Sequence, residues 1–89
     1  MGVDARDAHL ARARLARADL RGAVLHGAVL TYADLSHADA SGCDFTRAIL
    51  REAKLHRTLV ERAIWAEADR NGIEGTDPDL ARAEDFRAT

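Results

Sequence analysis

The sequence predicts a repeat protein, in which the chain winds into a regular coil instead of folding into a compact globule. Two observations support this prediction. From Leu10 to Trp65 every fifth residue is apolar, and from Ala8 to Ala68 the residue two places earlier in each unit is small. No charged residue enters either series over these ranges. Because such a short period persists through most of the chain, each unit is expected to form the same small structural element.

The apolar series supplies large side chains at every position except Ala40. We expect its large members to form the core: Leu10, Leu15, Leu20, Leu25, Leu30, Leu35, Phe45, Leu50, Leu55, Val60 and Trp65. The small series is alanine at every position except Cys43 and Thr58. Each unit therefore reads small, variable, large apolar, polar, polar. Phe45 and Trp65 are the bulkiest candidates for the core, and the alternative for Trp65 is an oligomer contact near the end of the series.

The five-residue period fits neither an amphipathic α-helix nor an ordinary β-strand. In an α-helix a five-residue step advances the large residues by about 140°, so they would spiral around the helix without forming one apolar stripe. In an ordinary half-buried strand, apolar and polar residues alternate with a period of two. Neither arrangement would bury this series.

An aspartate precedes the large position in several units, at Asp19, Asp34, Asp39, Asp44 and Asp69. Units such as Ala18-Asp19-Leu20 resemble the A-(D/N)-L-x-x signature of the pentapeptide-repeat family, and the resemblance covers residues 8–70. It implies an all-β fold, a right-handed quadrilateral parallel β-helix (solenoid) of about three to four coils. Each pentad would form one side of a square, with the large and small residues inward. Residues twenty apart would then stack at about 4.8 Å per coil.

This resemblance divides the chain into three parts. Residues 1–7 form a lead-in, residues 8–70 form the β-helix, and residues 71–89 form an irregular segment with a short C-terminal helix. Arg70 breaks the large series and is expected to end the regular coil. Asp77-Pro78-Asp79 provides helix-start signals, and the residues that would form a cap or a dimer contact follow at helical spacing: Leu80, Ala83 and Phe86. The alternative is a resumed coil, because Leu80 lies in phase.

The variable positions suggest two candidate surfaces. A basic face is expected from Arg14, Arg17, His37, Lys54 and Arg57, with His56 beside them. Its alternative is an ordinary solvated surface. A candidate apolar contact lies on two adjacent faces, at positions that the family usually leaves polar. Val29 and Ile49 are on one face with Tyr32 beside them, and Val24 and Ile64 are on the other. These residues predict a lateral contact, including a homodimer, although their β-propensity alone could also explain them.

Several functional classes are disfavoured. Cys43 is the single cysteine and lies in an inward position, so we expect an inert thiol. The four histidines do not provide three ligands on one face, so no metal and no cofactor are expected. No nucleophile has a base and acid at a recognisable spacing, so we expect no enzyme. The start of the chain lacks a secretory signal pattern and no apolar run is long enough for a membrane span, so we expect a cytoplasmic protein.

The sequence favours a non-enzymatic interaction module that presents flat solenoid faces to a protein partner. The alternative, implied by the resemblance, is a DNA-mimicking modulator of DNA gyrase or another type II topoisomerase that confers antibiotic or toxin resistance. DNA carries about one negative charge per 1.7 Å, so a mimic of roughly 16 Å would need about nine acidic groups in excess. Residues 8–70 instead contain eight acidic and ten basic residues, a net charge of +2. Direct nucleic-acid binding is disfavoured because no aromatic residue accompanies the basic positions.

Overall fold

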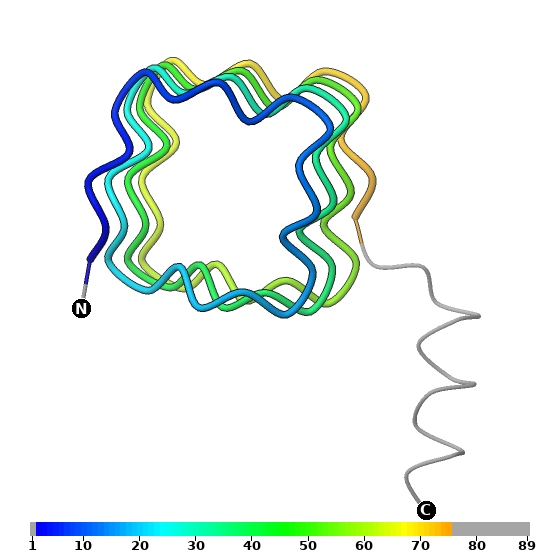
Figure 1. Ribbon diagram of the computed structural model, residues 1–89, viewed down its shortest axis with the longest axis horizontal. Coiled ribbons are helices and arrows are strands. Elements are labelled where there is room, and N and C mark those ends of the chain that lie inside the picture. The colour runs from blue at the N-terminus through cyan, green and yellow to red at the C-terminus, as the bar shows by residue number, and fades with distance from the viewer. Residues whose placement is uncertain (1, 76–89) are drawn as a thin grey trace, which may run out of the picture.

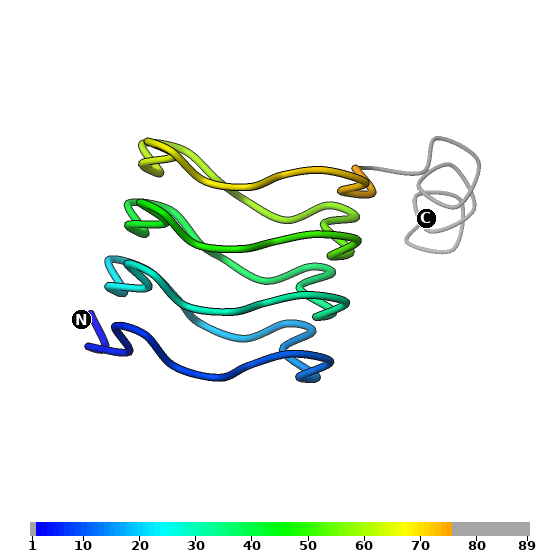
Figure 2. The same ribbon diagram turned by 90° about the horizontal axis from the view of Figure 1, so that it is seen from above.

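The chain winds into a square coil, seen along its axis in Figure 1 and from the side as stacked layers in Figure 2. The computed structural model describes residues 2–75. All isolated β-bridges within this range are parallel and join residues twenty apart, from Asp4 with Val24 to Lys54 with Glu74. Four pentads therefore complete one coil, which confirms the stacking register expected from the sequence.

Residues 2–75 contain no α-helix and no extended strand. Coils pair instead through single-residue bridges at the position that precedes each large residue, which we call the ladder position. The continuous strands of an ordinary parallel β-helix are absent from this part because a turn begins directly after every bridge and its large neighbour. The coils therefore stack in parallel as in a β-helix, but each pairing between them is one residue long.

A tight turn forms each corner of the square. In all fourteen turns the N–H of the small residue donates to the carbonyl of the large residue three positions earlier, at 2.9 to 3.2 Å. The second turn residue has a positive φ between 54° and 72°, and in ten of the fourteen turns it is not glycine. This geometry is that of a type II turn. The repeat therefore maintains a left-handed residue every five positions.

Backbone hydrogen bonds tie each coil to the next with one repeated pattern. The N–H of Leu10 donates to the carbonyl of Val29 at 2.7 Å, and the N–H of Val29 donates back to Ala8 at 2.9 Å. The N–H of the second turn residue Arg12 donates to Thr31 at 2.8 Å. Leaving His56 aside, the N–H of the first turn residue has no backbone acceptor within residues 2–75. One amide per unit therefore needs a side chain or water.

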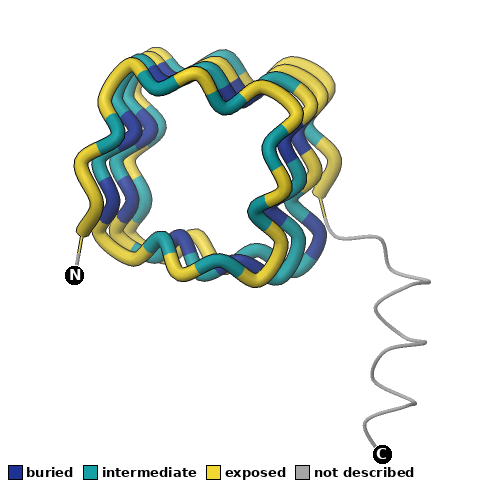
Figure 3. The backbone as a smooth tube through the Cα atoms, in the orientation of Figure 1, coloured by how far each residue is buried: buried dark blue, intermediate teal, exposed yellow. Residues whose placement is uncertain are grey.

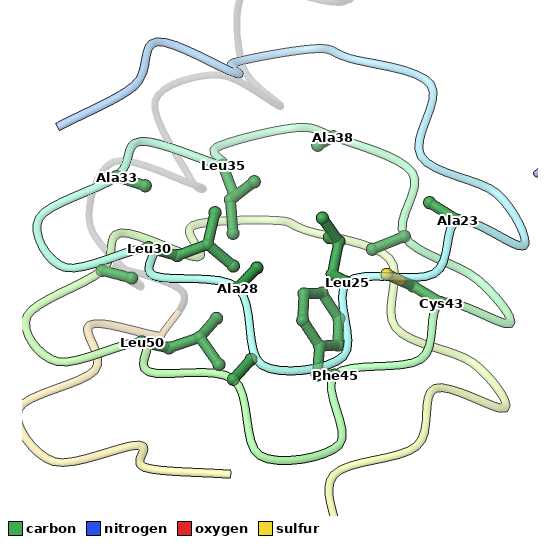
Figure 4. Packing of buried hydrophobic residues seen from close by; sticks show 13 residues of the cluster. Ala23, Leu25, Ala28, Leu30, Ala33, Leu35, Ala38, Cys43, Phe45 and Leu50 are labelled. Carbon is green, nitrogen blue, oxygen red and sulfur yellow. The ribbon is translucent and has the colours of Figure 1, made fainter. Parts of the chain in front are cut away.

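The large and small residues fill the interior, as the labelled side chains in Figure 4 show. The fully buried core extends from Ala23 to Ala53 and includes Leu25, Leu30, Leu35, Phe45 and Leu50. Phe45 and Trp65 stack with ring centroids 4.5 Å apart and an interplanar angle of 10°. Thr58 fits the small series because its hydroxyl donates to the carbonyl of Leu35 at 2.7 Å. The interior is thus filled mainly by alanine and leucine side chains that stack on those of the next coil.

Burial declines toward both ends of the coil, as the change from dark blue to teal and yellow shows in Figure 3. Leu10, Leu15 and Leu20 in the first coil are only partly buried, and so are Leu55 and Trp65. Val60 was expected in the core but is 38% exposed. Within residues 2–75 no coil stacks above Val60, so its packing there comes from the coil below alone.

The coil extends beyond the limits that the sequence predicted. Asp4 already bridges Val24, so stacking starts before residue 8. At the other end, Ile73 closes a turn onto Arg70, and Glu74 exchanges backbone hydrogen bonds with Ala53 and Leu55. Arg70 therefore does not end the coil, because at the open end its side chain need not enter the interior. The predicted helix containing Leu80, Ala83 and Phe86 lies outside the described residues.

Candidate interaction surfaces

The square coil presents four sides, each made of pentads twenty residues apart. Side 1 contains residues 3–7, 23–27, 43–47 and 63–67. Side 2 contains 8–12, 28–32, 48–52 and 68–72, and side 3 contains 13–17, 33–37, 53–57 and 73–75. Side 4 contains 18–22, 38–42 and 58–62. Sides 1 and 3 face in opposite directions, as do sides 2 and 4.

The residues predicted to form a basic face all lie on side 3. The bridges place Arg14, Asp34, Lys54 and Glu74 one above another, so charges of opposite sign alternate along the ladder column. Arg17, His37 and Arg57 occupy the second turn position of the same side. Side 3 is therefore basic at its corner and balanced along its centre.

His56 differs from its expected outward placement. Its side chain is only 8% exposed, and its ring meets that of His37 edge to face with centroids 5.3 Å apart. The first turn position below it holds the small Ser36, and the ring lies over the neighbouring corner instead of extending into solvent. The two histidines that the sequence placed on one face are thus in direct contact.

The residues of the predicted apolar contact divide between two neighbouring sides. Val29 and Ile49 bridge directly on side 2, where Tyr32 is 52% exposed and the Arg12 guanidinium lies 4.8 Å from its ring centroid. On side 1, Asp44 separates Val24 from Ile64 in the ladder column. These residues therefore form two patches on neighbouring sides, the division that stacking at twenty residues predicts.

Sequence reasoning missed an exposed apolar residue on a third side of the coil. Leu59 occupies the ladder position on side 4 and is 54% exposed, more than Ile64 at 49%. The signal was the same as for Val24 and Val29, a large apolar residue directly before the large position. Together with Val60 and Trp65, Leu59 and Ile64 make the C-terminal end of the described coil apolar. The Arg70 guanidinium lies 5.3 Å from the Trp65 ring centroid at this end.

The aspartates at ladder positions accept a hydrogen bond from the N–H of the first turn residue, the amide that lacks a backbone acceptor. Asp34, Asp39 and Asp44 accept the N–H of Ser36, Ser41 and Thr46, at 3.0, 3.1 and 2.9 Å. Within residues 2–75 the other ladder aspartates, Asp4, Asp19 and Asp69, do the same. This is an Asx turn, in which a short acidic side chain caps the backbone two residues ahead. It gives a physical reason for aspartate in the repeat.

These hydrogen bonds stabilise the charged form of each carboxyl. The side chain and amide of Ser36 hold the pKa of Asp34 below its ordinary value, and Ser41 does the same for the pKa of Asp39. For Asp19, hydrogen bonds from the Arg21 side chain and amide lower the pKa further. The ladder aspartates are thus ionised and engaged with their own turns.

The acidic groups do not form one continuous strip. Asp19 and Asp39 stack on side 4, but Leu59 follows them in the column. Arg21 pairs with Asp19 at 2.8 Å, and Arg47 pairs with Glu67 at 2.8 Å on side 1. The outer surface is therefore a mosaic of opposite charges with apolar interruptions.

Neither a metal cluster nor a reactive thiol emerges from the described part of the chain. Cys43 is buried in the small series, and burial raises the pKa of its thiol to about 12, so it stays protonated. No group of three or more histidine, cysteine, aspartate or glutamate residues converges between residues 2 and 75. Within the same residues no helix could span a membrane.

Comparison with known proteins identifies the repeat. The family model described as pentapeptide repeats matches in 8 copies, over residues 1–31, 8–47 and 28–64. A search of curated proteins found no match. Among solved structures, HetL from the cyanobacterium Nostoc, a pentapeptide repeat protein involved in heterocyst differentiation regulation, is 33% identical, with a TM-score of 0.30. That alignment covers 79% of this chain and 39% of HetL.

A pentapeptide repeat protein from the thylakoid lumen of Arabidopsis thaliana is 30% identical over 80% of this chain and 60% of its own, with a TM-score of 0.29. The present chain thus spans less than two thirds of either relative. Proteins with these repeats form right-handed β-helix solenoids and are generally non-enzymatic structural modules. The five-residue period, the twenty-residue stacking and the family match lead to one conclusion: the chain belongs to the pentapeptide-repeat family.

Proposed function

We propose that this protein is a non-enzymatic interaction module that presents the flat sides of its coil to a protein partner. The observation that carries the proposal is the exposure of large apolar side chains at ladder positions, which point away from the filled interior. Ile49, Leu59 and Ile64 are 37%, 54% and 49% exposed. Polar residues at these positions would leave the stacking unchanged, so the apolar choice is better explained by a contact than by the fold.

The rigidity of the coil supports the same role. Each side is fixed by backbone hydrogen bonds at 2.7 to 3.2 Å, while its ladder and turn residues vary without affecting the core. A partner would therefore meet a surface that needs little ordering on binding. The module would act as a scaffold or recognition element, including for a neighbouring enzyme.

The test compares partners captured by the wild type and by two surface variants. Ile49→Thr with Tyr32→Ser removes the apolar patch of side 2 and keeps the β-branched shape at position 49. The matched control, Lys54→Thr with Arg14→Ser, changes side 3 to the same extent. We expect a protein bound by the wild type and the control to be lost from the side 2 variant. Identical capture by all three folded proteins, and by a fourth that carries Leu59→Ser with Ile64→Thr, would contradict the proposal.

Modulation of DNA gyrase is the second candidate, and the stacked pair Asp19 and Asp39 on side 4 favours it. The interruption by Leu59 and the pairing of Asp19 with Arg21 weaken the resemblance of this side to a DNA backbone. A supercoiling assay decides the matter. Inhibition at stoichiometric protein that Asp39→Asn abolishes would support this function, whereas full gyrase activity in excess protein would exclude it.

A further inference from the structure

The two ends of the coil carry open backbone groups that match each other. In the first coil, the N–H of the ladder residues has no acceptor within residues 2–75, and this holds for Asp4, His9, Arg14 and Asp19. The carbonyls of the ladder and first turn residues in that coil also lack donors. Each pentad of the N-terminal edge thus offers one donor and two acceptors.

The C-terminal edge of the described coil has the reverse pattern. The amides of its large residues (Val60, Trp65, Arg70) and second turn residues (Arg62, Glu67, Gly72) donate to no acceptor in residues 2–75. The carbonyls of its small residues accept no hydrogen bond there. Each pentad thus offers two donors and one acceptor. The N-terminal edge of another copy would supply the missing partners in the pattern that already joins one coil to the next.

The side chains at the two edges are also complementary. Residues 3–22 contain five arginines and three aspartates, a net charge of 5 − 3 = +2. Residues 56–75, the last twenty described, contain three arginines and four acidic residues, a net charge of 3 − 4 = −1. Apolar interior side chains are partly exposed at both ends, with Leu10, Leu15 and Leu20 at one and Val60 and Trp65 at the other.

We propose that the N-terminal edge of one molecule stacks on the C-terminal edge of a second copy, so that the coil continues from molecule to molecule. A contact between two N-terminal edges would bring +2 against +2 and leave half of the acceptors without donors. Stacking in the same direction satisfies both the charges and the hydrogen bonds. The contact uses the ends of the coil, so it is independent of the sides assigned to a protein partner above. Because the two surfaces differ, it is heterologous and open-ended.

The test uses two variants that each block one end. His9→Pro removes an edge N–H that bonds nothing in residues 2–75, and proline is a residue that natural edge strands use against pairing. Val60→Lys places a charge in the open C-terminal interior. Thr31→Lys is the matched control, since it adds the same charge at a turn position in the middle of the coil, away from both ends. Arg14→Pro repeats the N-terminal block one pentad later, should His9→Pro fail to fold.

Sedimentation velocity of the full chain, from micromolar to millimolar concentration, measures the assembly, and circular dichroism checks folding. We expect the average mass of the wild type and of Thr31→Lys to rise with concentration and to fall with added salt. Each blocked variant alone should stay monomeric, with association at least tenfold weaker. An equimolar mixture of His9→Pro and Val60→Lys should form a dimer and no larger species, because one compatible pair of ends remains.

A wild type that stays monomeric at all concentrations would overturn the proposal. So would a mixture of the two folded blocked variants that fails to dimerise, since head-to-tail pairing requires it. Assembly of either blocked variant at the wild-type level would show that the ends are not the contact. Loss of end stacking would leave the capture experiment on side 2 unaffected, so the two proposals fail separately.

Discussion

The central coil and the first coil have nearly the same inward residues but differ in burial. In residues 23–42 the alanines and leucines of the two inward series have at most 1% of their surface exposed. In the first coil Ala8, Leu10, Ala13 and Leu15 remain partly exposed. Residue type is the same, so the difference comes from the number of coils stacked on each residue. The inward side chains of one coil are therefore buried only when other coils stack above and below them.

The largest effect that tests this comparison is the truncation of matched leucines. Leu30→Ala should destabilise the protein by about 2–5 kcal/mol, because Leu30 is fully buried and a cavity would remain. Leu10 lies in the same column one coil earlier, and its site is already open on one face. Leu10→Ala should therefore reduce the stability by about half as much. Urea denaturation followed by circular dichroism measures both. Equal losses would contradict the idea that burial is set by stacking.

A smaller effect is expected at the left-handed turn residues. Gly42 has a φ of 69°, and a Cβ there would lie 3.8 Å from its nearest neighbour, an ordinary contact. Gly42→Ala should therefore cost about 1–2 kcal/mol through backbone strain alone. Gly75→Ala is the control because Gly75 has no left-handed φ and no atom near its would-be Cβ. Thermal melting should lower the midpoint for Gly42→Ala and leave that of the control unchanged.

The Asx turns provide a pH-dependent test. Asp34→Ala should cost about 0.5–1 kcal/mol at neutral pH by leaving the Ser36 amide without its acceptor, whereas Asp34→Asn should cost less because an oxygen remains. The pKa of Asp34 is lower in the folded state, so its ionised form stabilises the fold above its unfolded pKa of about 3.9. This contribution is lost as the pH falls below about 4. Stability curves for the wild type and Asp34→Asn should converge there, and parallel curves would contradict the assignment.

The smallest expected effect belongs to an exposed ion pair between coils. Arg47 and Glu67 stack twenty residues apart at 2.8 Å, with side chains 64% and 69% exposed. A double-mutant cycle with Arg47→Ala and Glu67→Ala should give a coupling below about 1 kcal/mol that disappears in high salt. A larger or salt-resistant coupling would show that the outer columns help to hold the coils together.

The fold was accessible from the sequence because its period is short and its inward residues are uniform. The five-residue series located Leu30 and Phe45 in the core, and the resemblance provided the square. The ends were less predictable. Arg70 broke the apolar series, yet backbone pairing continued to Glu74, since an open end tolerates a residue that need not be buried. The exposure of Val60 follows from its place in the last coil of residues 2–75, whereas Leu30 in a central coil is fully buried.

The outer surface was predicted in composition but not in detail. Stacking at twenty residues placed Arg14, Asp34 and Lys54 in one column. The burial of His56 against His37 depends on side-chain rotamers, for which spacing carries no signal. The role of the ladder aspartates is predictable from the sequence, because an Asx turn needs only an aspartate two residues before an amide without a backbone acceptor. The binding roles of these surfaces remain predictions.

The measurement that tests the coil most directly is amide hydrogen exchange by nuclear magnetic resonance, read residue by residue. In the central coils, four amides of each pentad donate backbone hydrogen bonds and should be protected. The first turn amide should exchange quickly at His26, Thr31 and Arg51, and more slowly at Ser36, Ser41 and Thr46, where a ladder aspartate accepts it. The predicted result is one rapidly exchanging amide in every five residues, with slower exchange where a ladder aspartate accepts that amide. Uniform protection through consecutive residues, as in a helix, would contradict the account.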